Sequence, residues 1–503
     1  MLLPMNHDIA ISRSRAYPGE RAAARLDALL VLGRVDVSAL LPQLPESGRW
    51  QSLQQRTKAD AFSLRSTTLA NARQTQAVLA FADGEATQFQ RLALAGRMLA
   101  EIAARRPAQL GIIVDPTLPD AADWHEALLS AAHSHVFALP VFRRKAAPIW
   151  RLQRIQLYGA PALDLPRIRA TARAGNLVRW LTALPPNKLD ARAYRRLLTT
   201  LARRHRLQLR WYSEAQLRRL GAGAFLAVSR ANAASDAGIA HLVYRGRRGA
   251  ASPDVALVGK GIVFDTGGIN LKPHRGMLDM HTDMAGSAVA LASTLALAEL
   301  RTPLRVDAWL AITENNIGPS AYRPQEVVTA VNGTTIQVIH SDAEGRMALA
   351  DTLALAARTR PALLMDFATL TGACVYALSE RYSGVFTSDA ALMAPLRDTG
   401  ARSGERVWPF PLDEDFDSDI ESRIADIKQC SLDGKGDHIL AARFLKRFVP
   451  EGMRWVHMDL SSATRSGGLA HVNTEVTGFG ARYTLELVLS GDWRGAARIR
   501  RRA

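Results

Sequence analysis

Short apolar segments alternate with longer helical segments through the second half of the chain. Residues 254–258, 305–312, 335–340, 362–366 and 455–460 have the composition of buried strands, and residues 283–300, 346–358 and 369–378 have helical patterns. Strands separated by helices form a mainly parallel sheet with both faces covered. Sites in such sheets form at the carboxyl ends of the strands. We therefore expect an α/β fold whose chemistry lies along that edge.

A chain of 503 residues is too long for one ordinary core, so we expect more than one domain. Residues 1–165 predict a smaller N-terminal α/β domain, with apolar strands at 28–32 and 111–114 and a helix near 86–105. Residues 166–190 predict a basic linker helix that ends at Pro185 and Pro186. Residues 191–503 then form the larger C-terminal domain, with a mainly parallel, mixed sheet covered by helices.

The composition is that of a globular protein in a reducing compartment. Apolar residues make up 48% and charged residues 22% of the chain, which argues against disorder as its main state. Cys374 and Cys430 are too few for a disulfide framework. The first eight residues lack the pattern of a signal peptide, and the longest apolar run, at 284–298, is too short to span a bilayer. We expect a cytoplasmic protein without a membrane segment.

The net charge of +17 is unevenly distributed. Residues 151–250 alone carry +16, residues 251–503 carry −3, and a short basic run stands at Arg498 and 500–502. Such a basic region could attract nucleic acid. A solvated arginine-rich surface is the simpler interpretation, because neither a regular interleaving of aromatic and basic residues nor a known binding motif accompanies the charge.

Three glycine-rich segments, at 258–273, 280–286 and 340–346, carry the chemistry. They supply four carboxylates, two lysines and one arginine, namely Asp265, Asp283, Asp342, Glu344, Lys260, Lys272 and Arg346. Two like charges 4 Å apart repel by about 4 kcal/mol at an effective dielectric constant of about 20. A cluster of four carboxylates therefore needs bound cations or protonation of some of its members. Two divalent ions would neutralise it.

Taken alone, each side chain has an ordinary structural explanation. Asp283 precedes an alanine-rich helix and could serve as its N-cap. The run Gly259-Lys260-Gly261 could be a simple turn or a phosphate loop, although it lacks the spacing of the latter. Gathered in one pocket, these seven residues would favour a two-metal site instead. Oxygen-rich ligation suits Mg²⁺ or Mn²⁺, and a nitrogen ligand adds Zn²⁺.

These segments resemble the leucyl aminopeptidase family, the cytosolic metallo-aminopeptidases. The family signature Asn-Thr-Asp-Ala-Glu-Gly-Arg corresponds here to His340-Ser341-Asp342-Ala343-Glu344-Gly345-Arg346. The resemblance covers roughly residues 177–480 and includes further blocks at 184–187, 221–224, 320–324, 368–374 and 477–480. Several blocks in the right order make it specific.

The resemblance implies a two-metal aminopeptidase that removes the N-terminal residue of peptides through a bridging, metal-bound hydroxide. It implies that Lys260, Asp265, Asp283 and Glu344 bind one ion and that Asp265, Asp342 and Glu344 bind the other. The ions would be Mn²⁺ or Zn²⁺, with Mg²⁺ as a further candidate. Lys260 would bind as the neutral amine, a form that nearby cations favour.

The same resemblance implies roles beyond the metal ligands. Lys272 would stabilise the oxyanion of the tetrahedral intermediate, and Arg346 would hold a bicarbonate ion that acts as general base. The pocket for the first side chain of the peptide would be lined by Met280, Thr369, Leu370 and Gly372. The family also implies a homohexamer.

The chain departs from the family pattern at a few positions. His340 and Ser341 replace Asn and Thr of the signature, and His281 stands where another basic residue is usual. Asp437 and His438 replace small residues beside the pocket, which bears on substrate preference more than on catalysis. Two alternatives stay open: a DNA-binding regulator of the same family, and a catalytically degenerate paralog.

Overall fold

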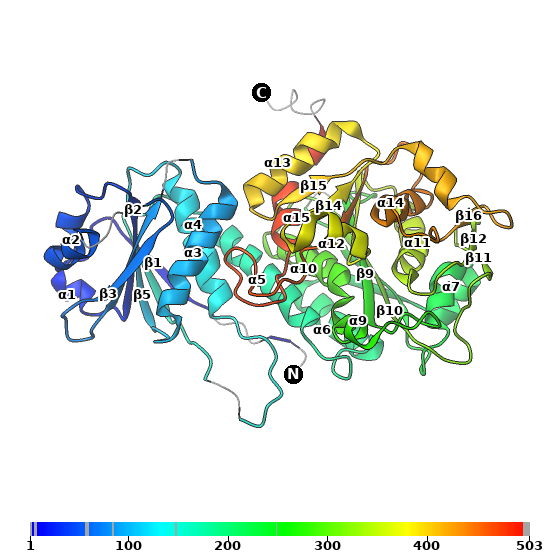
Figure 1. Cartoon of the computed structure of the whole chain (residues 1–503), viewed down its shortest axis with the longest axis horizontal. Coiled ribbons are helices and arrows are strands. Elements are labelled where there is room, and N and C mark those ends of the chain that lie inside the picture. Colours follow the sequence, from blue (N-terminus) through cyan, green and yellow to red (C-terminus); the bar gives the residue numbers. More distant parts are fainter. Residues whose placement is uncertain are drawn as a thin grey trace. The chain divides into compact units, whose positions relative to one another are not determined.

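Figure 1 shows the structure of the chain, a computed structural model. It describes residues 3–4, 8–55, 60–82, 85–145, 148–247 and 249–495. Two compact units are present. The main unit comprises Met1–Pro4, Arg173–Arg465 and Val476–Ala503, and the N-terminal unit comprises Met5–Ala172 and Ser466–Glu475. Residues 1, 2 and 5–7 at the start of the chain and the basic run at 498–502 lie outside the described residues.

The described part of the N-terminal unit contains a six-stranded sheet. In sheet order its strands are β1 (Ala10–Ser14), β6 (Arg154–Tyr158), β5 (Gln109–Val114), β2 (Ala28–Arg34), β4 (Gln76–Ala82) and β3 (Leu64–Thr68). Neighbouring strands are parallel, except that β3 is antiparallel to β4. The helices are α1 (Glu20–Ala23), α2 (Ser47–Gln55), α3 (Gln88–Ala103) and α4 (Ala121–His135).

Strand β2 is apolar on both faces because both faces are covered. Leu30 packs in one core with Trp124 of α4, and Leu29 packs in another with Trp50 of α2. Successive side chains of a strand point to opposite faces, so a continuous apolar run such as this one marks a central strand. The smaller α/β domain expected from the sequence is confirmed.

The main unit is built on an eight-stranded sheet within the described residues. In sheet order its strands are β15 (Val407–Pro409), β14 (Ser383–Phe386), β17 (Trp455–Asp459), β13 (Leu363–Ala368), β9 (Val255–Asp265), β10 (Val306–Asn315), β8 (Gly238–Tyr244) and β7 (Gln208–Ser213). The central strands β17, β13, β9 and β10 are parallel. Strand β8 is antiparallel to β10, and β14 is antiparallel to β17. The sheet is therefore mainly parallel and mixed, as expected.

Helices cover both faces of this sheet. The helices of the main unit are α6 (Ala191–His205), α7 (Glu214–Leu220), α8 (Gly223–Ser229), α9 (His274–Met277), α10 (Ala285–Glu299), α11 (Glu344–Ala357), α12 (Gly372–Leu378), α13 (Met393–Ser403), α14 (Asp437–Lys446) and α15 (Ala481–Ser490). Gly259 of β9 meets Gly286 of α10, whereas its neighbour Lys260 meets Gly345 of α11. Adjacent strand residues point to opposite faces, so α10 and α11 lie on opposite sides of β9.

Three expectations about the elements were wrong in detail. The strand expected at 254–258 continues to Asp265 as β9, so Lys260 lies in a strand and not in a following turn. The strand expected at 335–340 is only β12 (Thr335–Gln337), and it pairs with β11 (Val327–Thr329) and β16 (Ile427–Lys428) in a separate small sheet. The helix expected from Asp283 begins at Ala285 with Met284 as its N-cap, so Asp283 is not its cap.

The predicted linker region contains helix α5 (Leu165–Thr182), which ends before the two prolines. The division into residues 1–165, 166–190 and 191–503 stays a prediction. Within the described ranges, none of the helices combines the length and the apolarity that a membrane crossing requires.

Candidate active site

A β-bulge in β9 brings two of the predicted ligands to one face of the sheet. Ile262 is paired with Thr313 and Asp265 with Asn315, so β9 advances by one residue more than β10. Without this extra residue, Lys260 and Asp265 would point to opposite faces, because they are five positions apart. The bulge restores Asp265 to the face of Lys260. Both side chains are buried.

The turn after β9 is held against the turn that carries Asp342. Ser341 Oγ donates to the carbonyl of Gly267 over 2.6 Å, and the N–H of Asn270 donates to Ser341 Oγ over 2.8 Å. Gly267 has φ +86°, a conformation that favours glycine. Tyr322 Oη donates to the carbonyl of Ser341 over 2.7 Å. The substituted Ser341 therefore joins the two turns.

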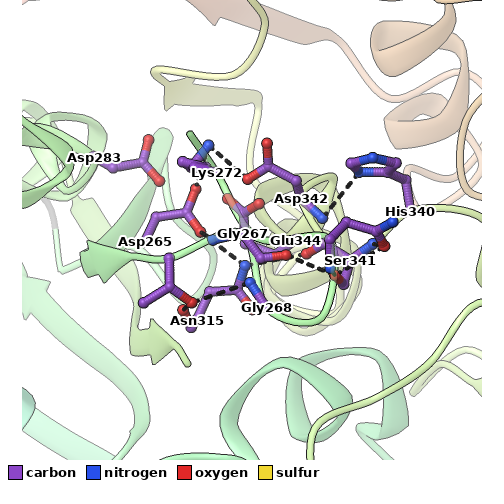
Figure 2. A network of polar contacts seen from close by, with 12 residues as sticks. Asp265, Gly267, Gly268, Lys272, Asp283, Asn315, His340, Ser341, Asp342 and Glu344 are labelled. Atoms are coloured by element: carbon purple, nitrogen blue, oxygen red, sulfur yellow. Dashed lines mark hydrogen bonds and ion pairs between the residues drawn. The ribbon is translucent and has the colours of Figure 1, made fainter. Parts of the chain in front are cut away.

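Three carboxylates converge where these turns meet. One oxygen each of Asp265, Asp342 and Glu344 lies within 4.8 Å of the other two. Figure 2 shows these groups approaching one another from separate segments, with Asp283 beside Asp265. Oxygen donors so close together, two of them from buried residues, suit a divalent cation. The residues present thus fit the metal ions that the family resemblance implies.

Lys260 connects Asp283 to the other carboxylates. Its Nζ lies 2.8 Å from Asp283 Oδ2 and 2.9 Å from Glu344 Oε1, and it donates to the carbonyl of Thr369 over 3.0 Å. A Cβ at Gly345 would lie 2.6 Å from the Nζ of this lysine. The glycine of the signature is therefore required sterically, because it leaves the space that the Lys260 side chain fills.

Lys272 neutralises the opposite side of the cluster. Its Nζ lies 3.0 Å from Asp265 Oδ2 and 2.5 Å from Asp342 Oδ1. The other oxygen of Asp265, Oδ1, accepts from Gly267 N and from Asn315 Nδ2, each over 2.8 Å. The two ammonium groups together compensate much of the charge that the carboxylates bring.

Burial shifts the titration of the cluster strongly. Desolvation raises the pKa of Asp283 and of Glu344 to about 7 and that of Asp342 to about 6, and the neighbouring carboxylates add to the effect. Burial alone would lower the pKa of Lys260 and of Lys272, but the surrounding carboxylates outweigh it and raise both. Both lysines are therefore charged here, and cations would have to replace this charge before Lys260 could bind as a neutral amine.

Arg346 has a partner that the sequence did not assign to it. Its Nη2 lies 2.9 and 2.8 Å from the two carboxylate oxygens of Asp437, and its Nη1 donates to the carbonyl of Gln429 over 3.2 Å. The resemblance implied a bicarbonate ion at this guanidinium. In the structure a carboxylate of the chain itself contacts it.

Of the four residues predicted to line the substrate pocket, two make hydrogen bonds to carboxylates in or near the cluster. Thr369 Oγ1 donates to Asp283 Oδ1 over 2.8 Å, and the N–H of Leu370 donates to Asp459 Oδ1 over 3.0 Å. Both are half-buried beside the cluster. Met280 lies in a short 3₁₀ helix and Gly372 begins α12, and their place in a substrate pocket stays a prediction. His281 does not belong to the group of potential ligands found in the described residues.

Sequence reasoning missed several residues that support the site. They are Asn315, Tyr322, Gln429 and Asp459, whereas Asp437 was expected beside the pocket but not as the partner of Arg346. Asn315 ends β10, the parallel neighbour of β9, so the carboxyl-end rule could have indicated it. Gln429 follows a two-residue strand that has no recognisable pattern, and no sequence signal points to it.

Comparison with known proteins agrees with this geometry. Residues 176–485 match the model of the cytosol aminopeptidase family, catalytic domain. The chain is 37% identical over 363 residues to a probable cytosol aminopeptidase of Parasynechococcus marenigrum (strain WH8102), covering 71% of this chain and 74% of the relative. It is 40% identical over 315 residues to one of Geobacter sp. (strain M21), covering 62% and 63% of the two chains.

Two solved structures share the fold over nearly the whole chain. The bottromycin maturation enzyme BotP in complex with Mn superposes with a TM-score of 0.81 at 28% identity, covering 93% of this chain and 99% of BotP. A tomato leucine aminopeptidase mutant superposes with a TM-score of 0.84 at 23% identity, covering 97% and 98% of the two chains. The matched region contains every residue of the carboxylate cluster, and the chain belongs to the cytosol aminopeptidase family of metal-dependent peptide hydrolases.

Proposed function

We propose that the chain hydrolyses the N-terminal peptide bond of peptides with the help of two divalent metal ions. The observation that supports this most is the convergence of Asp265, Asp342 and Glu344, with Asp283 linked to Glu344 through Lys260. The ligands of one ion are Lys260, Asp265, Asp283 and Glu344, and those of the other are Asp265, Asp342 and Glu344. Such ions polarise a carbonyl oxygen and lower the pKa of water.

The side chains around the cluster then have distinct tasks. Lys272 contacts two of the proposed ligands and remains charged, so it stabilises negative charge that develops on the carbonyl oxygen. Asp283 contacts both Lys260 and Thr369, and in this proposal the α-amine of the peptide binds beside these three residues. Half-buried Met280 and Leu370, with Thr369 and Gly372, line the pocket for the first side chain. Binding of a free α-amine makes the reaction exopeptidic.

The proposed ions are Mn²⁺ or Zn²⁺, with Mg²⁺ as a third candidate. The proposed ligands are carboxylate oxygens and one amine nitrogen. The nitrogen makes this ligand set more suitable for Mn²⁺ and Zn²⁺ than a set of oxygens alone. The structurally similar BotP was solved with Mn. A cytoplasmic location and a homohexameric assembly, implied by the family resemblance, are part of the proposal. The alternatives of a DNA-binding regulator or a degenerate paralog gain no support from the comparisons.

A peptide panel tests the proposed function. The protein, purified and loaded with Mn²⁺ or Zn²⁺, is expected to release the first residue from dipeptides and aminoacyl amides. N-acetylated versions of the same substrates, which lack the free amine, are expected to remain intact. Product release is measured by mass spectrometry. Failure to cleave any free-amine substrate with either metal would contradict the proposal, and cleavage of the acetylated set would contradict the exopeptidic part of it.

Metal binding is expected to depend steeply on pH. The pKa values of Asp283 and Glu344 are raised to about 7 and that of Asp342 to about 6, so ions must displace protons from these groups. Affinity for Mn²⁺ should fall by at least about tenfold between pH 8 and pH 6, as measured by titration calorimetry.

In the metal-free protein the same raised pKa values mean that the folded state holds protons that the unfolded state has released. The free energy of unfolding should therefore decrease as the pH rises from about 4 to about 7. An affinity independent of pH would contradict this prediction.

A further inference from the structure

The contact between Arg346 and Asp437 places a carboxylate of the chain beside the proposed metal ligands. Arg346 is 2% exposed and lies in the first turn of α11, two residues after Glu344. One of its nitrogens contacts both oxygens of Asp437. The Asp437 side chain is 25% exposed, whereas that of Arg346 is 3% exposed. The guanidinium is thus buried behind the carboxylate, and the carboxylate keeps access to solvent.

The electrostatic neighbours of Asp437 are residues of the site. Burial lowers the pKa of Arg346, but Asp437, followed by Cys430 and Glu344, raises it above its usual value, so the guanidinium lies within electrostatic range of both carboxylates. Burial lowers the pKa of His340, and Lys272 and Asp437 act on the same ring. Asp437 therefore acts on Arg346 and on His340, two side chains of the 340–346 segment that Glu344 and Lys272, respectively, also influence.

The contact with Arg346 leaves part of the Asp437 carboxylate available for hydrogen bonds. It is the first residue of α14, and the turn before it is formed by Gly436 with φ +60°. Each carboxylate oxygen has two lone pairs. Arg346 donates one hydrogen bond to each oxygen of Asp437, so one lone pair on each oxygen is not used by the arginine. The arginine fixes the orientation of the carboxylate and leaves it partly exposed, so an oxygen is available to a water molecule that binds within hydrogen-bond reach.

We propose that Asp437 is the general base of the peptide hydrolysis and that Arg346 positions it. This inference rests on the proposed function. A water oxygen attacks the scissile carbonyl carbon, the C–O bond forms, and the carbonyl π electrons move to the oxygen. The proton of the water passes to the Asp437 carboxylate. When the C–N bond breaks, the same proton passes to the leaving amine, so that a free amino acid and a shortened peptide result.

A soluble anion at Arg346 is the competing explanation. The family resemblance implies bicarbonate there, and it would need the same Nη2–H groups that Asp437 occupies. The Nε of Arg346 is buried and has no acceptor among the described residues, so one donor is left for such an anion. The two explanations differ in whether activity requires bicarbonate.

Substitutions at Asp437, assayed in carbonate-free buffer on the metal-loaded enzyme, test the proposal. Asp437→Asn is expected to lower kcat by about 10²–10⁴-fold, the usual contribution of a positioned general base. Asp437→Gly should lose as much activity and regain at least about tenfold of it with added bicarbonate, which would fill the vacated place. The matched control Asp433→Asn changes an exposed residue of the preceding loop and should retain the wild-type rate. The wild type should be unaffected by bicarbonate.

Direct binding provides a readout that does not depend on activity. In ¹³C NMR, labelled bicarbonate is expected to bind to the Asp437→Gly protein and not to the wild type. Metal content should be the same in both, since Asp437 is not a proposed ligand. Stimulation of the wild type by bicarbonate, binding of bicarbonate to it, an active Asp437→Asn protein, or loss of metal from that variant would each overturn the proposal. A wild type inactive towards every peptide would instead refute the proposed function.

Discussion

Replacing Glu344 with glutamine is expected to lower kcat/KM for peptide hydrolysis by about 10³-fold or more. Glu344 is shared between the two proposed metal ions, and a metal ion supplies several kcal/mol of transition-state stabilisation. A loss of about 4 kcal/mol corresponds to about 10³-fold in rate. The expected loss therefore follows from the departure of one ion, and metal content should fall with activity.

The same substitution is expected to stabilise the metal-free protein at pH 8. Burial and the neighbouring carboxylates raise the pKa of Glu344 to about 7, so its charged form is disfavoured in the fold relative to the unfolded chain. A neutral glutamine removes that penalty. Thermal unfolding of metal-free wild type and Glu344→Gln at pH 8 measures the effect, with Glu421→Gln on the surface as control. A fully active variant, or a metal-free variant less stable than wild type, would contradict the role given to Glu344.

Replacing Lys272 with methionine is expected to lower kcat by about 10²–10³-fold, the usual cost of removing one group that stabilises an oxyanion. KM should change little, because the negative charge on the carbonyl oxygen develops only in the transition state. Steady-state kinetics on a dipeptide amide separate the two constants. The surface residue Lys435, whose side chain is 87% exposed, provides the control variant Lys435→Met. A rise in KM with an unchanged kcat would assign Lys272 to substrate binding instead.

The fold was largely predictable because its signal is local. Apolar runs such as 111–114 and 362–366 are buried strands, and the alternation with helices implied parallel pairing. The carboxylates were predictable because three glycine-rich segments carry them and because these segments, in their order along the chain, resemble the leucyl aminopeptidase family. The strands needed only local patterns, whereas the site needed that resemblance to bring separate segments together.

The features that the sequence did not predict depend on contacts between distant segments of the chain. The bulge that turns Asp265 towards Lys260 arises from the register between β9 and β10, which no local pattern encodes. Strand β12 looked like a member of the main sheet, yet it pairs with β16, which lies about 90 residues further along the chain. Asp437 was recognised as unusual, but its contact with Arg346 joins the starts of two helices far apart in sequence. Tertiary contacts decided all three.

The position of Lys260 inside β9 has a consequence for how the site can open. Strand β9 is hydrogen-bonded to β10 along its length and to β13 along its first half. Local opening is confined to weakly held segments, whereas a central strand loses its hydrogen bonds only when the whole unit unfolds. Two of the proposed ligand positions are therefore tied to global unfolding, while Asp342 lies on a turn. If the proposed ions bind there, their release would leave Lys260 and Asp265 in place for the next ion, and metal exchange would not require the site to lose its shape.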